Sequence, residues 1–184
     1  MTSTPLTPDA RRTPAPNRHA ILIATGFGLG RVPKAPGTAG SLGAAVVFAP
    51  LFFGLENPLW QFVYFLALMG LALVALWSTE AALPHWTSAD PQAVVIDEIL
   101  GQWLTYGGLV LAVVLGRSLG PTHAGWKYLL AGFILFRVFD VLKPFPIRRS
   151  EQFPGAAGVL LDDVLAAVYA GAGLMALVWS GWLT

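Results

Sequence analysis

The sequence predicts an all-α fold, a polytopic integral membrane bundle of about four to five apolar helices with a Gly/Pro-rich N-terminal loop. Of the 184 residues, 55% are hydrophobic and only 11% are charged. The mean hydropathy is +0.65, which lies well outside the profile of an ordinary soluble domain. The apolar residues also gather in runs that approach the roughly 20 residues needed to cross a bilayer.

The start of the chain differs from the rest. The stretch "MTSTPLTPDARRTPAP" is rich in Thr and Pro and has no hydrophobic pattern, so residues 1–17 are predicted to form a disordered tail. Residues 18–184 are predicted to form a single helical membrane domain. Its apolar segments are expected at about 41–55, 58–77, 98–116, 126–142 and 158–183. The first of these is short for a complete span.

Prolines mark several boundaries of these segments. Pro58 is expected to begin the second segment, and Pro144 to stop the fourth. Pro84 and Pro91 keep the linker between the second and third segments irregular. No linker between separate domains is evident.

The basic residues predict an orientation. Five of the eleven Lys and Arg residues precede the first apolar segment: Arg11, Arg12, Arg18, Arg31 and Lys34. Under the positive-inside rule, the N-terminus and the linkers 78–97 and 143–157 are cytoplasmic, and every polar cluster falls on that face. In an alternative topology the first segment is re-entrant, which separates the N-terminal loop from the later acidic residues; the charge rule disfavours it.

Five carboxylates lie beside or within the apolar segments: Asp97, Glu98, Asp140, Asp162 and Asp163. Clustered acids in a partly desolvated place must be protonated or meet a cation. Mg²⁺ takes oxygen ligands and satisfies this most simply, whereas zinc is unattractive because the chain has no cysteine and no paired histidine. Alternatively, these acids cap helix N-termini, with the last two at the start of the fifth segment. Glu80 has no predicted partner and is expected to be interfacial.

Basic residues accompany the acids. Arg137 and Lys143 stand three residues to either side of Asp140, which places all three on one helical face. They either form ion pairs with Asp140 or, together with Arg148, form a cationic cradle for phosphate oxygens.

The loop "GFGLGRVPKAPGTAGSLGAA" offers Thr38 and Ser41 just ahead of an expected helix. Backbone amides and hydroxyls at a helix N-terminus bind anions readily. The loop matches neither a GxxxxGK[ST] motif nor a dinucleotide fingerprint, so a nucleotide site is not expected. Because the histidines are scattered and no D-x-D motif occurs, the remaining chemistry is that of water activated by a metal or a carboxylate.

Three stretches together resemble the phosphatidylglycerophosphatase A family of bacterial membrane lipid phosphatases: "PKAPGTAGSLGA", "VVIDEILGQWLT", and "FRVFDVLKPFPIRR" followed by "GAAGVLLDDVLAAV". The resemblance covers about residues 19–175. Two positions depart from the family pattern. The chain has "SADPQA" where members often carry a histidine, and Ala156 where they carry a second glycine.

The resemblance implies Mg²⁺-dependent hydrolysis of phosphatidylglycerophosphate to phosphatidylglycerol and inorganic phosphate, in phosphatidylglycerol and cardiolipin synthesis. It implies a multi-pass protein of the bacterial inner membrane with its active site on the cytoplasmic face. By position, it assigns catalytic and metal-binding roles to Asp97, Glu98, Asp140, Asp162 and Asp163. It assigns phosphate binding to Thr38, Ser41, Arg137, Lys143 and Arg148.

Two other functional classes remain open at this point. A phosphoalcohol transferase also gathers aspartates at a membrane face, and an ion or proton carrier uses intramembrane carboxylates. Carriers tend to place such acids at mid-membrane, whereas these lie near segment ends. The expected partner is the membrane lipid substrate. With a net charge of +1, no nucleic-acid partner is expected, and no protein partner is predicted.

Overall fold

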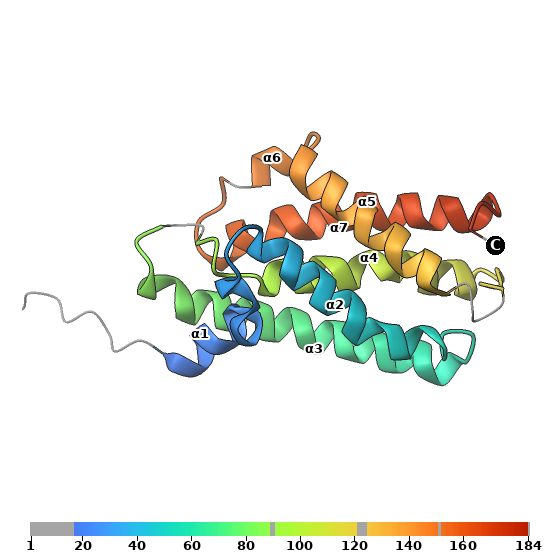
Figure 1. The fold of residues 1–184 in the computed structure, drawn as a ribbon, viewed down its shortest axis with the longest axis horizontal. Coiled ribbons are helices and arrows are strands. Elements are labelled where there is room, and N and C mark those ends of the chain that lie inside the picture. Colours follow the sequence, from blue (N-terminus) through green and yellow to red (C-terminus); the bar gives the residue numbers. More distant parts are fainter. Residues whose placement is uncertain (1–16, 89–90, 121–124, 151, 184) are drawn as a thin grey trace, which may run out of the picture.

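The computed structural model describes residues 17–88, 91–120, 125–150 and 152–183, and every regular element among them is helical (Figure 1). The long helices are α2 (Pro36–Phe52), α3 (Pro58–Ala82), α4 (Ile96–Val114), α5 (Gly125–Leu142) and α7 (Ala156–Trp179). The short ones are α1 (Arg18–Ala24), α6 (Ile147–Ser150) and the 3₁₀ segments η1 (Gly26–Arg31) and η2 (Leu83–His85). The all-α prediction is confirmed.

Helices α4 and α7 pack against each other most closely, while α2 and α3 flank α4 and α5 lies against α7. Glycines permit this approach. A side chain at Gly108 would collide with the backbone carbonyl of Gly171, and a Cβ at Gly101 would come within 2.6 Å of the Phe136 ring. These contacts hold α4 against α5, which carries Asp140, and against α7, which carries Asp162 and Asp163.

Aromatic side chains fill the core between α2, α3, α4 and α5. Phe48 stacks on Tyr106, with ring centroids 4.4 Å apart. The buried tyrosine hydroxyls all donate to backbone carbonyls: Tyr64 to Trp103 at 2.8 Å, Tyr106 to Leu129 at 2.9 Å and Tyr128 to Leu119 at 2.7 Å. Because a buried hydroxyl without a partner is costly, these bonds fix the relative positions of the helices.

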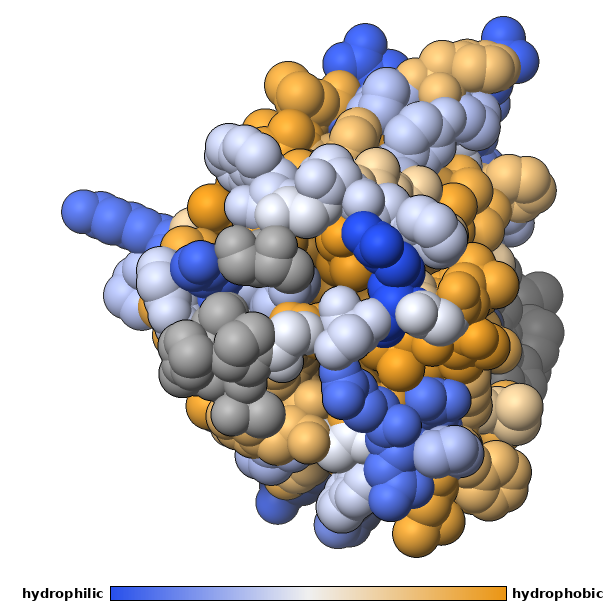
Figure 2. Space-filling model, turned by 90° about the vertical axis from the view of Figure 1, so that its right-hand side faces the viewer, coloured by the Kyte–Doolittle hydropathy of each residue, from blue (hydrophilic) through white to orange (hydrophobic). Residues whose placement is uncertain are grey.

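Helix α3 exposes apolar side chains around most of its circumference. Leu59, Phe62, Met69 and Leu73 are each at least 60% exposed. Two helical stretches, Pro58–His85 and α7, are long and apolar enough to cross a membrane. Seen from the end of the bundle that carries the C-terminus, polar residues spread across that end, with apolar residues among them and at the rim (Figure 2). These features indicate membrane association.

The helices extend beyond the predicted apolar segments at their polar ends. Helix α2 begins at Pro36 rather than near residue 41, since proline is favourable in the first turn of a helix. Helix α3 continues to Ala82 by burying Ser78 and Thr79 completely. Hydropathy alone missed these ends because small and polar residues there pack against neighbouring helices.

The N-terminal loop and the linker after α5 contain short helices that were not predicted. Helix α1 begins where the Asn17 side chain accepts a hydrogen bond from the Ala20 amide at 3.1 Å. The loop then packs on the segment before α4, where the Val95 amide donates to the Ala24 carbonyl at 2.9 Å. The predicted disordered tail, 1–17, lies outside the described residues except for Asn17.

Glu80 has a partner that lies 76 residues away in the sequence. Its Oε2 atom accepts a hydrogen bond from the Ala156 amide at 3.0 Å, at the first residue of α7. The sequence offered no partner of obvious spacing for Glu80, and the structure gives it one on a distant helix. Glu80 caps α7 from α3, in the place that a local Asp or Ser usually takes.

Four helix ends come together at one end of the bundle: the starts of α2, α4 and α7 and the end of α5. Residues from all four line a single pocket. Ala35, Pro36 and Gly37 of the N-terminal region share that pocket with Asp140 and the other acids. This arrangement contradicts the alternative topology, which separated the loop from the acidic residues.

Candidate active site

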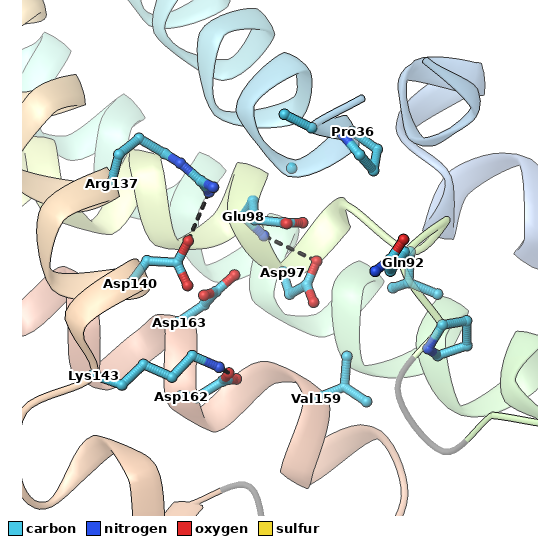
Figure 3. A pocket seen from close by; sticks show the side chains of 14 residues that line it. Pro36, Gln92, Asp97, Glu98, Arg137, Asp140, Lys143, Val159, Asp162 and Asp163 are labelled. Carbon is cyan, nitrogen blue, oxygen red and sulfur yellow. Dashed lines mark hydrogen bonds and ion pairs between the residues drawn. The ribbon is translucent and has the colours of Figure 1, made fainter. Parts of the chain in front are cut away.

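A pocket of about 300 Å³ opens at this end of the bundle (Figure 3). Its lining includes all five of the predicted acids and two of the predicted basic residues: Asp97, Glu98, Arg137, Asp140, Lys143, Asp162 and Asp163. They come from α4, from α5 and the residue just after it, and from α7. The convergence expected from the sequence therefore occurs in the structure.

Three of the acids form the closest group. Asp97 and Glu98 of α4 and Asp163 of α7 each offer a carboxylate oxygen, and these oxygens lie within 4.8 Å of one another. Asp97 and Asp163 are only 7% and 4% exposed. Three carboxylates in so small and dry a space repel one another strongly unless a proton or a cation intervenes.

The group has the properties of a binding site for a hard divalent cation, which takes carboxylate oxygens as ligands. Glu98 Oε2 is buried and has no hydrogen-bond partner within the part of the chain that the structure describes. A buried carboxylate oxygen of this kind is costly without a partner, and a cation would supply one. The all-oxygen ligand set fits Mg²⁺ better than zinc.

The remaining two acids form ion pairs with the two basic residues of the pocket. Arg137 Nη1 lies 2.7 Å from Asp140 Oδ2, and Lys143 Nζ lies 2.7 Å from Asp162 Oδ2. The first pair lies along α5, whereas the second joins the end of α5 to α7. The ion-pair interpretation of Arg137 is thus confirmed, and Lys143 finds a partner on another helix.

Lys143 reaches α7 because of its backbone conformation. It follows the last residue of α5 and has a φ of 42°, in the left-handed region that L-residues seldom adopt. Its amide still donates to the Phe139 carbonyl at 2.9 Å, as in a helix C-cap. The chain direction changes at this point, and the ammonium group lies over α7. Strain of this kind tends to be kept at functional sites.

Asp162 and Asp163 lie nearly two turns inside α7, which begins at Ala156. The prediction that they start this helix is therefore wrong. Because the free amides that an acid could cap belong to the first turn, these two residues do not serve as caps. By contrast, Asp97 Oδ1 accepts a hydrogen bond from the Glu98 amide at 3.0 Å in the first turn of α4.

Gly37 holds the start of α2 against the acidic group. A side chain at this position would collide with the carboxylate of Glu98. The approach is prepared by Lys34 and Ala35, which have φ values of 66° and 63° and turn the chain sharply before Pro36. The conformation of this loop therefore places the first turn of a helix next to a carboxylate, with no side chain between them.

Three predicted phosphate ligands do not line the pocket: Thr38, Ser41 and Arg148. Ser41 is fully buried, and its hydroxyl donates to the Gly37 carbonyl at 2.9 Å. Arg148 is exposed on α6.

The pocket also has lining residues that sequence reasoning missed, among them Gln92 and Val159. Gln92 belongs to the stretch "SADPQA", whose departure from the family pattern was the one available signal.

Clustered carboxylates flanked by paired cations form the kind of site that performs metal-assisted phosphoryl chemistry. Residues 22–178 match the family described as Phosphatidylglycerophosphatase A. This match covers most of the chain and every residue of the pocket. The chain therefore belongs to the phosphatidylglycerophosphatase A family.

Individual relatives agree with this assignment. The Phosphatidylglycerophosphatase A of Haemophilus influenzae is 37% identical over 150 residues, covering 81% of this chain and 82% of the relative. That of Escherichia coli is 30% identical over 162 residues, covering 88% and 84%. A Bacteroides thetaiotaomicron protein named "Putative phosphatidylinositol-3-phosphatase" is 40% identical over 157 residues, covering 84% and 90%. No solved structure shows a significant match.

Proposed function

We propose that this protein is a Mg²⁺-dependent phosphatase that hydrolyses phosphatidylglycerophosphate to phosphatidylglycerol and inorganic phosphate, in phosphatidylglycerol and cardiolipin synthesis. The observation that carries the proposal is the pocket, in which five carboxylates and two cations meet at one end of an apolar helical bundle. Membership of a lipid phosphatase family favours this function over the transferase and carrier alternatives.

In this proposal Asp97, Glu98 and Asp163 hold the cation, with Asp140 and Asp162 beside them. When bound, the cation supplies positive charge next to the phosphoryl oxygens and activates water. The buried Glu98 oxygen without a hydrogen-bond partner supports this assignment.

Arg137 and Lys143 bind the phosphate group. Their side chains are 22% and 24% exposed, so each can reach a ligand while it remains paired with an aspartate. As the transition state forms, the two cations neutralise charge on the phosphoryl oxygens. Ser41 and Arg148 contribute indirectly: Ser41 donates a hydrogen bond within the first turns of α2, and Arg148 adds positive charge outside the pocket.

The reaction itself is a displacement at phosphorus. A water oxygen forms a bond to phosphorus as the ester bond to the glycerol oxygen breaks. One pocket carboxylate accepts the proton of the water, and the departing glycerol oxygen takes up a proton to become a hydroxyl. Asp97 and Asp163 are nearly buried, so their charges are only weakly screened by water.

The five long helices cross the bacterial inner membrane in this proposal, with the pocket on the cytoplasmic face. Helix α2 has 17 residues and is about 25 Å long, which is somewhat short of the roughly 30 Å hydrocarbon core. Basic residues lie next to the pocket end of the bundle in sequence, as the positive-inside rule requires for a cytoplasmic face: Arg31, Lys34, Arg148 and Arg149.

A second substrate has specific support. The relative that is 40% identical bears the name of a phosphatidylinositol-3-phosphatase. Both lipids present a phosphate monoester on a hydroxyl-bearing headgroup, so the same carboxylates and cations would serve either. The choice between them depends on the headgroup contacts at the mouth of the pocket.

The test is phosphate release by the purified protein from phosphatidylglycerophosphate and from phosphatidylinositol 3-phosphate, each with and without Mg²⁺. An Asp162→Ala, Asp163→Ala double variant is the matched control. Mg²⁺-dependent release from phosphatidylglycerophosphate that the double variant lacks would support the proposal. Release from phosphatidylinositol 3-phosphate alone would replace the substrate, and release from neither by folded protein would reject both.

A further inference from the structure

A second cavity, of about 410 Å³, forms an apolar groove between α2 and α5. Its lining is almost without polar atoms and includes Leu42, Val46 and Ala49 of α2 and Trp126, Leu130 and Phe133 of α5. The groove contains none of the acidic residues and has no part in the chemistry described above.

The groove continues the line of the active-site pocket along the same two helices. On α5, Phe133 is followed one turn later by Arg137, and then by Asp140, on the same helical face. On α2, Leu42 lies five residues after Gly37, about 7.5 Å further along the helix axis. A molecule that extends out of the pocket past Arg137 along α5 would reach Phe133, the nearest groove residue on that helix, one turn away.

Trp126 and Arg137 are eleven residues apart on α5, about 16 Å along the helix axis, and the groove residues from Trp126 to Phe133 take about 10 Å of this distance. One acyl chain spans about 15 Å, which is half of the hydrocarbon core of a bilayer. An acyl chain whose phosphate lies at Arg137 would therefore pass through the groove and end near Trp126.

The groove is closed at its far end and open along its side. Phe52 and Tyr128 stack with centroids 5.6 Å apart, and a Cβ at Gly125 would come within 2.5 Å of the Phe52 ring, so α2 and α5 converge there. Along the side, Val46 is 65% exposed and Trp126 is 61% exposed. A lipid can thus enter sideways from the bilayer without passing through water.

Arg137 lines the pocket one turn beyond the groove residue Phe133. Its side chain points from α5 towards Glu98 beneath the start of α2 (Figure 3). A Cβ at Gly37 would lie 3.4 Å from Arg137 Nη1. A guanidinium at this position marks the level of the phosphate, with the charged pocket on one side and the apolar groove on the other.

From these observations we infer that the groove binds one acyl chain of the phosphorylated lipid whose phosphate occupies the pocket. The inference rests on the proposed function, in that the ligand is a lipid phosphate monoester. The other apolar cavity, between α3, α4 and α7, includes Tyr64 and Gly108. It adjoins an acid rather than a cation, because its residue Ala167 lies one turn after Asp163 on α7.

Filling the groove tests the inference kinetically. Val46→Trp and Ala49→Phe place bulk in the groove, and Val47→Trp is the control, since Val47 is 63% exposed on the same helix but does not line the groove. The readout is the ratio of kcat/KM for a long-chain substrate to that for a dihexanoyl analogue with the same headgroup. We expect this ratio to fall about tenfold in the two groove variants, as the loss of a few buried methylenes predicts, and to stay unchanged in Val47→Trp.

Photolabelling tests it independently of hydrolysis. The probe is a phosphatidic acid with a diazirine in one acyl chain, bound to the full chain in nanodiscs. Label concentrated on residues 42–49 and 126–133, and reduced in Ala49→Phe, would support the inference that the groove binds an acyl chain. This holds even if the protein releases no phosphate, because that result would reject only the proposed function. Label spread evenly over the exposed side chains of α3, or an unchanged kinetic ratio in an active enzyme, would overturn the inference while the proposed function stood.

Discussion

Gly37 and Glu98 approach so closely that no side chain fits between the first turn of α2 and the carboxylate. The contact joins the Gly/Pro-rich loop to the acidic motif of α4, which lies about sixty residues further along the chain. Through it, the position of a proposed cation ligand depends on the backbone of a helix that carries no acid in the pocket.

Adding a single methyl group at position 37 should therefore disturb the acidic group. We expect Gly37→Ala to displace Glu98 and lower the rate of phosphate release by about 100-fold, the usual cost of misplacing a catalytic group by about 1 Å. Gly70→Ala is the control, because a Cβ at Gly70 meets nothing within 4 Å. Full activity in Gly37→Ala would show that the position of Glu98 does not matter to the reaction.

The ion pair between Lys143 and Asp162 should contribute to stability as well as to catalysis. Lys143→Met leaves a largely buried carboxylate without its cation, and we expect the free energy of unfolding to fall by about 1–3 kcal/mol. Adding Asp162→Asn should restore most of this stability but not the activity, which a double-mutant cycle in detergent can measure. Lys127→Met, near the other end of α5, serves as the control. Equal losses in the single and double variants would argue against coupling between the two residues.

Mg²⁺ should stabilise the folded protein through the acidic group. A cation that binds only the native state adds about 2.7 kcal/mol at a concentration of 100 times its Kd, so the Tm should rise with Mg²⁺ and fall back with a chelator. Asp97→Asn and Asp163→Asn should each reduce this rise. Glu56→Gln should not, because Glu56 lies at the opposite end of the bundle, where it accepts a hydrogen bond from Ser118. A rise that persists in both aspartate variants would place the cation elsewhere.

Glu80 should stabilise α7 through its cap on the Ala156 amide. Glu80→Ala is expected to lower the free energy of unfolding by about 0.5–1 kcal/mol, the usual value of an N-cap. Glu80→Gln keeps an acceptor oxygen and should lose less. Thermal unfolding of the three proteins checks this, and identical Tm values would mean that water replaces the cap at no cost.

The absence of cysteine allows a direct test of orientation. Phe153→Cys lies near the pocket end and Ser118→Cys at the opposite end, and both native residues are exposed. In intact cells stripped of their outer membrane, an impermeant maleimide should label position 118 at once and position 153 only after lysis. The reverse pattern would place the pocket on the outer face.

The acidic pocket could be predicted from the sequence because its signal is strong and local. Asp97, Glu98, Asp162 and Asp163 interrupt apolar runs, and a charge in such a place requires a partner. The same logic identified Asp140, which stands between two basic residues. Hydropathy also located the five long helices, and most of their predicted ends lie within a few residues of the observed ones.

What the sequence did not reveal depends on contacts between distant segments. The partner of Glu80 is an amide 76 residues away, and no local spacing points to it. The exclusion of Ser41 from the pocket follows from a hydrogen bond along its own helix, which is a common alternative for a serine there. The direction of Lys143 follows from a single left-handed residue, a conformation that hydropathy and charge patterns do not register.

The distribution of the acids over α4, α5 and α7 has a consequence for biosynthesis. The ribosome delivers these helices in order, and the last carboxylates, Asp162 and Asp163, emerge only with the final helix. Until that helix has been made, the nascent chain lacks two of the five proposed ligands. Under the proposed function, a chain truncated before α7 should therefore be unable to act on lipids.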